Sequence, residues 1–440
     1  MDECILILIY ILTVIVLKYI TYSTINSYAC ITLPYVAIVI LNNFIFHYRF
    51  NYYEINSHII YTTVFGLLFF AMGSSVPYFI NKNNSIKNDR CIHRLNIGMM
   101  KRAMNAIVIL MFLVTLIYLY IFTTKGAETV KLNDYALLNE NSLLSHLRIW
   151  LGALLPLILF FDIKLSQKLL LIGFGLFLTS ISFVKYHAIF ISLYIFFYYI
   201  FMKSPRSILE IVRKCIIASV VIFSIFLLNY YVLLNGNLNI EFLKFILNHI
   251  WKYIAGGTIA FESVVDLSIS DPAFSKTLDM FLPIPKLILN KIGFQIPTFS
   301  SLSTTTHWVK VSASGQITNV FSTFSQICAG GLLSSAVVLL FWGAITSYVY
   351  KIGNETRNSN VKLCCASIIS FMVLSFFANF WILSNPWEYS LSALIIPCFL
   401  RTKHHQCSHR GACIGKIEVL SKGDKTVNLS TKETVKTLNT

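Results

Sequence analysis

The chain has 440 residues, of which 56% are hydrophobic and only 12% are charged. Because a soluble domain carries about 25% charged residues, this composition excludes an ordinary soluble protein and predicts a polytopic membrane protein. The net charge of +16 does not indicate a nucleic-acid partner, since the Lys and Arg residues lie mostly between apolar runs and in the tail, where they set membrane orientation.

Apolar runs predict an all-α fold with about 11 transmembrane helices, in a range of about 10–12. They fall at about 4–21, 29–47, 58–80, 103–123, 146–161, 168–184, 186–202, 212–234, 327–350, 362–383 and 386–400. Four regions follow: an N-terminal bundle of about eight helices (1–234), a large loop (235–326), about three C-terminal helices (327–400) and a polar, disordered tail (401–440).

Charge in the short connectors predicts the orientation. Asn81–Arg102 and Lys203–Lys214 are rich in Lys and Arg and are expected in the cytoplasm. Thr124–Ser145 has more acidic residues than basic ones and is expected outside. By alternation the large loop also faces out, and the tail faces the cytoplasm.

Within the large loop, the pattern of Glu241–Ile254 is helical, and Gly256 is a plausible C-cap that stops the helix. A helix lying on the membrane surface is the simpler interpretation. Further on, His307–Val311 alternates like a short strand. The hydroxyl groups, the indole and Lys310 of this region suit a polyol ligand, and they equally suit an exposed hairpin.

Two cations mark a candidate anion site. Lys185 and Arg148 both lie at the predicted outer end of a span, and each is close to a His, His187 and His146 respectively. An ionisable group in such a place faces a water-filled cavity or snorkels to the interface. If the cations converge, they form a site for an anion.

Metal and nucleotide chemistry have little support in the sequence. The tail contains a dense Cys/His group whose spacing fits no standard zinc finger, so no metal site is predicted. The group consists of His404, His405, Cys407, His409 and Cys413. No Walker-type or GxGxxG sequence occurs, which argues against an ATP-driven pump, and no cofactor is expected.

Four further features are a small-residue stretch with a Lys at Thr179–His187, a Tyr-x-x-Gly-Gly segment at Tyr253–Gly257, an Asn-x-aromatic segment at Asn319–Phe324, and one dominant outer loop in the second half. In this order and placement they resemble the bacterial O-antigen polymerase family. The family often has Asp-Phe-Gly after the third segment. This chain has Cys328-Ala329-Gly330, so any role for that Asp is absent.

The resemblance implies a GT-C-like glycosyltransferase in the bacterial inner membrane, with its active site facing the periplasm. It would polymerise O-antigen repeat units carried on undecaprenyl pyrophosphate, in lipopolysaccharide biosynthesis, beside a chain-length regulator and a flippase. An O-antigen ligase and a polysaccharide flippase or transporter are the alternatives.

The implied roles fall on particular residues. Lys185 and Arg148 would stabilise the departing pyrophosphate. The candidates for the general base are Glu262, Asp266, His187 and His307. Residues expected to shape the site or bind sugar are Tyr253, Gly256, Gly257, Asn319 and Lys310.

Overall fold

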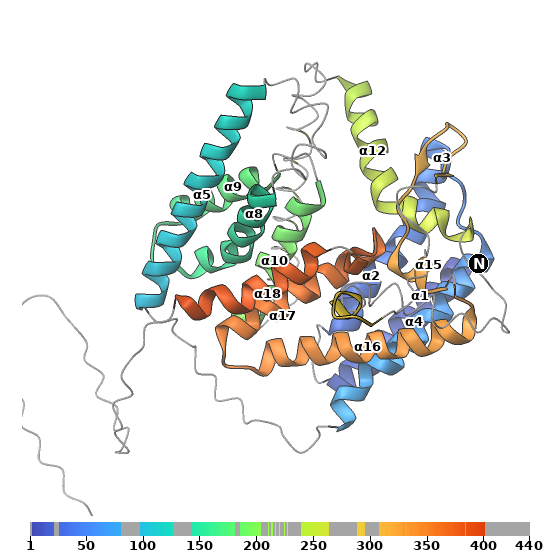
Figure 1. Ribbon diagram of the computed structural model, residues 1–440. Coiled ribbons are helices and arrows are strands. Elements are labelled where there is room, and N and C mark those ends of the chain that lie inside the picture. The colour runs from blue at the N-terminus through green and yellow to red at the C-terminus, as the bar shows by residue number, and fades with distance from the viewer. Residues whose placement is uncertain are drawn as a thin grey trace, which may run out of the picture. The chain divides into compact units, whose positions relative to one another are not determined.

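The computed structural model describes residues 2–21, 26–80, 97–125, 142–180, 185–203, 239–263, 288–294, 308–328, 330–382 and 384–400, with isolated positions between 210 and 227. These residues are mostly helical (Figure 1). Seven of the described helical segments are long and apolar enough to cross a membrane, as the composition predicts for a multi-pass membrane protein.

The elements of the first half are α1 (Asp2–Thr21), α2 (Ser27–Leu41), η1 (Asn42–Phe46), α3 (His47–Phe50), α4 (Ser57–Ile80), α5 (Ile97–Lys125), α8 (Ser142–Leu154), η2 (Leu155–Phe160), α9 (Leu165–Ser180) and α10 (Lys185–Lys203). Those of the second half are α12 (Ile240–Ile259), η3 (Ala260–Ser263), β1 (Val309–Lys310), β2 (Ile317–Thr318), α15 (Thr323–Cys328), α16 (Leu332–Glu355), α17 (Ser359–Val373), η4 (Leu374–Phe376), η5 (Phe380–Ile382) and α18 (Ser384–Phe399).

The seven candidate spans correspond to seven of the predicted ones. They are Asp2–Thr21, Ser27–Phe50, Ser57–Ile80, Gly98–Ile121, Leu143–Phe160, Leu332–Glu355 and Ser359–Phe376. The predicted spans 168–184 and 186–202 appear as the shorter apolar helices Leu165–Thr179 and His187–Lys203. The predicted span 212–234 and the tail 401–440 lie outside the described residues, apart from single positions, so the total of about 11 stays a prediction.

Helices α4 and α16 make the most extensive helix pair in the described chain, and two glycines allow their close approach. A Cβ atom placed at Gly73 would overlap the carbonyl oxygen of Leu340, and one placed at Gly343 would overlap that of Phe70. Small residues allow such contacts between helices in membranes. The pair therefore packs backbone against backbone.

Helix α17 connects two sets of helices. On one side it packs against α16 and α2, and on the other against α10 and α18. In Figure 1, α17 and α18 accordingly run between the green helices α8–α10 and the blue helices α2 and α4. The ring of Phe371 in α17 stacks on Phe190 of α10, with 3.9 Å between the ring centroids.

A small cap joins the segment after α3 to the hairpin of β1 and β2. Strands β1 and β2 form the predicted hairpin, and its inner edge pairs with the segment after α3. The amide of Tyr53 donates to the carbonyl of Val311 at 3.0 Å, and that of Ala313 donates to Asn51 at 2.9 Å. Asn51 adopts a left-handed backbone with φ of 55°, which Asn tolerates better than most residues.

The Tyr52 hydroxyl extends this cap to α12, because it donates to the backbone and side-chain oxygens of Asn248 at 2.9 and 2.7 Å. One turn further along α12, Trp251 stacks on Phe46 with 3.8 Å between the ring centroids. Its indole N–H donates to Asn42, at 3.3 Å. Helix α12 is therefore held against η1 and the segment that follows α3.

Candidate functional site

Arg148 and His187 lie together inside the helical bundle, although 38 residues separate them in the sequence. Both are 8% exposed. The guanidinium is close enough to the imidazole for their charges to interact. The structure thus brings together two residues of the predicted anion site, one from α8 and one from α10.

Arg148 also has a structural role. Its Nη2 donates to the carbonyl of Thr179 at 2.6 Å, in the last turn of α9. The last carbonyl groups of a helix lack partners within it and carry a partial negative charge, so a cation there stabilises the helix end. Arg148 therefore fixes the end of α9, the helix that precedes α10 in the sequence.

Helix α10 begins at Lys185, whose side chain lies outside the described part of the structure. The N-terminus of a 19-residue helix carries a partial positive charge and favours anions. His187 is in the first turn of this helix. The helix end, His187 and Arg148 are thus arranged so that a negatively charged group would be stabilised.

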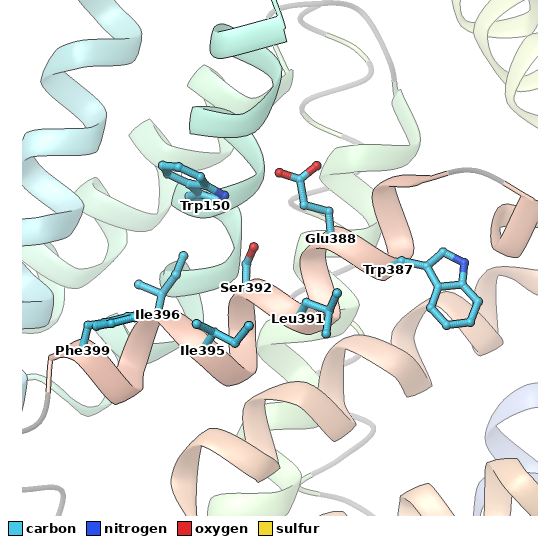
Figure 2. Close-up of a pocket in the computed structure, with 8 residues that line it drawn as sticks. All are labelled: Trp150, Trp387, Glu388, Leu391, Ser392, Ile395, Ile396 and Phe399. Atoms are coloured by element: carbon cyan, nitrogen blue, oxygen red, sulfur yellow. The ribbon is translucent and has the colours of Figure 1, made fainter. Parts of the chain in front are cut away.

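A second feature lies near the beginning of α8. The Nδ1 of His146 pairs with the carboxylate of Glu388 at 2.6 Å, so the beginnings of α8 and α18 are joined. An apolar cavity of about 530 Å³ begins at Glu388 and runs along α18 (Figure 2). It is lined by Trp150, Trp387, Glu388, Leu391, Ser392, Ile395, Ile396 and Phe399. His146 thus pairs with an acid and is not part of the Arg148 site.

The Gly256–Gly257 pair does not end its helix, so the C-cap interpretation is wrong. Helix α12 continues to Ile259, longer than the predicted Glu241–Ile254. A Cβ placed at Gly257 would lie 2.8 Å from the amide nitrogen of Ser322 and 3.1 Å from the carbonyl oxygen of Phe377. Gly257 is therefore a position of close backbone approach, while Gly256 packs on the side chain of Thr318.

Four segments meet at this approach and form a buried polar cluster. Its members, each at most 5% exposed, are Tyr35, Thr258, Ser322, Thr323, Ser325, Gln326, Ser375 and Asn379. The Tyr35 hydroxyl donates to Ser375 at 3.1 Å, and the Thr323 hydroxyl donates to the carbonyl of Ala378 at 3.2 Å. Buried hydroxyl and amide groups are thus contributed by the end of α12, by α15 and by the interrupted helix α17–η4–η5.

Two donors of the polar cluster are not used within the described residues. The hydroxyl of Thr258 and the side-chain nitrogen of Gln326 are buried, and neither has a hydrogen-bond partner there. A buried polar group without a partner is costly. These donors are available to water or to a polar ligand. No pattern in the sequence indicates that Thr258 and Gln326 are buried donors.

A series of aromatic rings connects the polar cluster with the Arg148 site. Tyr253 contacts Phe377, and Phe377 contacts Phe380, with centroid separations of 6.1 and 5.9 Å. Phe380 contacts Phe371, and Phe371 contacts Tyr389, with 6.0 Å between the ring centroids in each pair. The ring of Tyr389 in turn lies 6.2 Å from that of His187. The two regions are therefore parts of one continuous interior.

The other predicted residues are dispersed. Asn319 is half-buried just after β2, while Lys310 is exposed on β1. Glu262 lies in η3, with its side chain outside the described part, and His307 and Asp266 lie wholly outside it. Within the described ranges, no group of three or more His, Cys, Asp or Glu residues is placed to hold a metal ion.

The apolar spans and the buried cationic and polar groups define a multi-pass, mostly helical membrane protein. The chain belongs to the family of unknown function DUF6337, which matches residues 49–406. No curated protein and no solved structure matches it.

Proposed function

We propose that this protein polymerises oligosaccharide repeat units carried on undecaprenyl pyrophosphate, on the periplasmic face of the bacterial inner membrane, with a GT-C-like architecture. The observation that carries the proposal is that Arg148 and His187 are both buried and lie within electrostatic range of each other at the beginning of α10, where Arg148 donates to the end of α9. Both were expected in the site from the resemblance to O-antigen polymerases. A buried guanidinium next to a helix N-terminus is suited to a pyrophosphate leaving group.

In the reaction, the bond between the sugar anomeric carbon and the pyrophosphate oxygen breaks. The same carbon forms a bond to a hydroxyl oxygen of the acceptor unit, whose proton passes to a base, and undecaprenyl pyrophosphate leaves. Arg148 and Lys185 would stabilise the charge that develops on the pyrophosphate. His187 is the base candidate whose side chain lies beside Arg148, so we assign it the acceptor proton.

Contacts between helix ends support the proposed orientation. The beginnings of α8 and α18, both predicted outside, are joined by His146 and Glu388. On the opposite side, Lys351 near the end of α16 donates to the carbonyl of Pro77 near the end of α4, at 3.1 Å. These ends are predicted in the cytoplasm. Arg148 and His187 lie near the beginnings of α8 and α10, on the same predicted outer side as the His146–Glu388 pair. This is the side on which lipid-linked units would be joined.

The test is deletion of the gene in the native host, followed by electrophoresis of lipopolysaccharide. A polymerase predicts core plus a single repeat unit and no ladder. Complementation with wild type should restore the ladder, and Lys185→Ala, Arg148→Ala and His187→Ala should not. Lys164→Ala is the matched control, because Lys164 is an exposed lysine before α9 on the predicted cytoplasmic side, and it should restore the ladder fully.

Arg148 needs one further comparison because it also holds the end of α9. Arg148→Lys keeps the charge but changes the geometry at Thr179. Partial ladder from Arg148→Lys, with normal expression of Arg148→Ala, would support a charge-dependent role. Core without any repeat unit after gene deletion would indicate a ligase or flippase, and an unchanged ladder would refute the proposal.

A further inference from the structure

The cavity between α8 and α18 changes from polar to apolar along its length. On α18, the lining residues Glu388, Ser392, Ile395 and Phe399 follow one another at spacings of three and four, so they form one stripe of the helix. The carboxylate of Glu388 lies at one end, the hydroxyl of Ser392 follows one turn later, and the rest of the stripe is apolar (Figure 2). The indole of Trp150 covers the cavity from α8. The cavity is therefore shaped for an amphiphile.

The length and surroundings of the cavity fit a lipid chain. Eleven residues of helix separate Glu388 from Phe399, which is about 16–17 Å, close to the half-thickness of about 15 Å of a bilayer hydrocarbon core. The polar end is the end at which α8 and α18 begin, on the predicted outer side. Leu391, Ile395 and Phe399 are exposed, and an apolar cavity does not hold water. A hydrocarbon chain that enters from the outer leaflet therefore suits this space.

Ser392 indicates which class of lipid fits. It is 8% exposed, and its hydroxyl makes no hydrogen bond to the described residues. A buried hydroxyl needs a partner, and Ser392 lies about 6 Å further into the membrane than Glu388. A glycerophospholipid carries its ester carbonyls at about this distance from the headgroup, and a carbonyl accepts a hydrogen bond from a hydroxyl. A polyprenyl phosphate has only hydrocarbon at that depth.

The charges at the polar end fit a headgroup that contains both signs. Oε1 of Glu388 pairs with Nδ1 of His146 at 2.6 Å, and a carboxylate has further acceptor sites for an ammonium group. The N-termini of α8 and α18 carry partial positive charge, which favours a phosphate. A headgroup with a phosphate and an ammonium, as in phosphatidylethanolamine, complements both features. An anionic headgroup would meet the carboxylate without a cation of its own.

The cavity is distinct from the Arg148 site. His146 and Trp150 lie one turn apart on one face of α8, and Arg148 points about 160° away from each, toward Thr179 of α9. A lipid in the cavity is therefore separate from the lipid-linked donor proposed for Arg148.

We propose that the cavity between α8 and α18 binds a glycerophospholipid of the outer leaflet. Its ammonium group lies at Glu388, an ester carbonyl accepts from Ser392, and one acyl chain runs along Ile395 and Phe399. The lipid fills the space between the two helices and stabilises their contact. This site involves no chemical step and does not depend on the polymerase activity.

The experiment uses native mass spectrometry to measure lipid binding to the purified, delipidated full-length protein in detergent. The probes are dioleoyl phosphatidylethanolamine, its ether-linked analogue without carbonyl groups, dioleoyl phosphatidylglycerol and undecaprenyl phosphate. Wild type should bind the ester about two- to tenfold more tightly than the ether, which is the range expected for one hydrogen bond. Phosphatidylglycerol should bind more weakly than phosphatidylethanolamine, and undecaprenyl phosphate most weakly of the four.

Three variants test the assigned contacts. Ser392→Ala should bind the ester and the ether equally, and Glu388→Gln should lose the preference for phosphatidylethanolamine over phosphatidylglycerol. Ile395→Trp fills the cavity and should weaken binding of phosphatidylethanolamine by about tenfold or more. Ile345→Trp is the matched control, because it makes the same change at an exposed isoleucine of α16, and it should bind within about twofold of wild type.

The comparison of lipids on wild type needs no variant, so it holds even if a substituted protein fails to fold. Equal binding of the ester and the ether by wild type would overturn the proposal. Tighter binding of undecaprenyl phosphate than of phosphatidylethanolamine, abolished by Ile395→Trp, would also overturn it and assign the cavity to the lipid carrier. Binding that is unchanged in Ile395→Trp would show that the lipids attach elsewhere, and it would reject the site.

Discussion

The substitution Gly257→Ala tests whether the glycine pair of α12 is a position of close approach. The neighbours that a Cβ at Gly257 would meet are all backbone atoms: the Ser322 nitrogen at 2.8 Å, the Phe377 oxygen at 3.1 Å and the Phe321 carbonyl carbon at 3.3 Å. Ordinary contact begins at 3.4 Å. The segment before α15 would have to move by several tenths of an ångström.

Gly256→Ala is the matched control. A Cβ at Gly256 meets only side-chain atoms of Thr318, the nearest at 3.2 Å, and a side chain adjusts more easily than backbone. Both substitutions gain about 1 kcal/mol of helix propensity, which cancels when they are compared. Because overpacking costs about 1–3 kcal/mol, Gly257→Ala should be less stable than Gly256→Ala by about that amount.

The assay is reversible unfolding of each purified variant in mixed micelles of a mild detergent and dodecyl sulfate, followed by circular dichroism. It yields the free energy of unfolding directly. If Gly257→Ala is as stable as Gly256→Ala, the reasoning from close approach is wrong. If both are strongly destabilised, the glycines are needed for their backbone conformation, as a helix stop would require.

Three further predictions concern the scaffold and use the same unfolding assay. Gly343→Ala should lower the free energy of unfolding several times more than Gly173→Ala changes it. The first substitution inserts a methyl group between two helix backbones, while a Cβ at Gly173 would meet no atom within 4 Å. Trp251→Phe keeps a ring for stacking but leaves the buried oxygen of Asn42 without its donor, so it should lose about 1–3 kcal/mol. Burial raises the pKa of the Tyr52 phenol, so folding favours the neutral phenol. The stability that Tyr52 contributes is therefore complete below about pH 10 and declines as the pH rises toward the raised pKa. Tyr52→Phe should reduce the alkaline loss of stability, and an identical pH profile would contradict the burial argument.

The helical nature of the chain follows from its apolar runs, and seven predicted spans have counterparts among the candidate spans. The helix at Glu241–Ile254 was predicted correctly in kind, but its end was wrong. Two adjacent glycines are the usual signal for a stop, and here they permit tertiary packing instead. Only the neighbour at Ser322, which is 65 residues away, distinguishes these cases.

The convergence of Lys185 and Arg148, each with a neighbouring His, could be stated from the sequence only as a hypothesis, because periodicity within one helix says nothing about another helix. The structure places Arg148 close to His187. The polar cluster was missed for a different reason. Ser375 and Asn379 lie in the apolar run 362–383, where small polar residues are common in membrane helices. Their burial against Tyr35 and Thr323 is a property of the tertiary structure.

The pairing of residues 51–53 with 311–313 has a consequence for biogenesis. About 260 residues lie between the partners, and closing a loop of that length costs on the order of 5 kcal/mol of chain entropy. During translation, residues 51–53 emerge long before residues 311–313, with which they pair. Assembly of the cap therefore comes late, after the intervening spans have been inserted. A chain whose synthesis stops before residue 311 leaves the backbone groups of residues 51–53 without the partners they have in the cap.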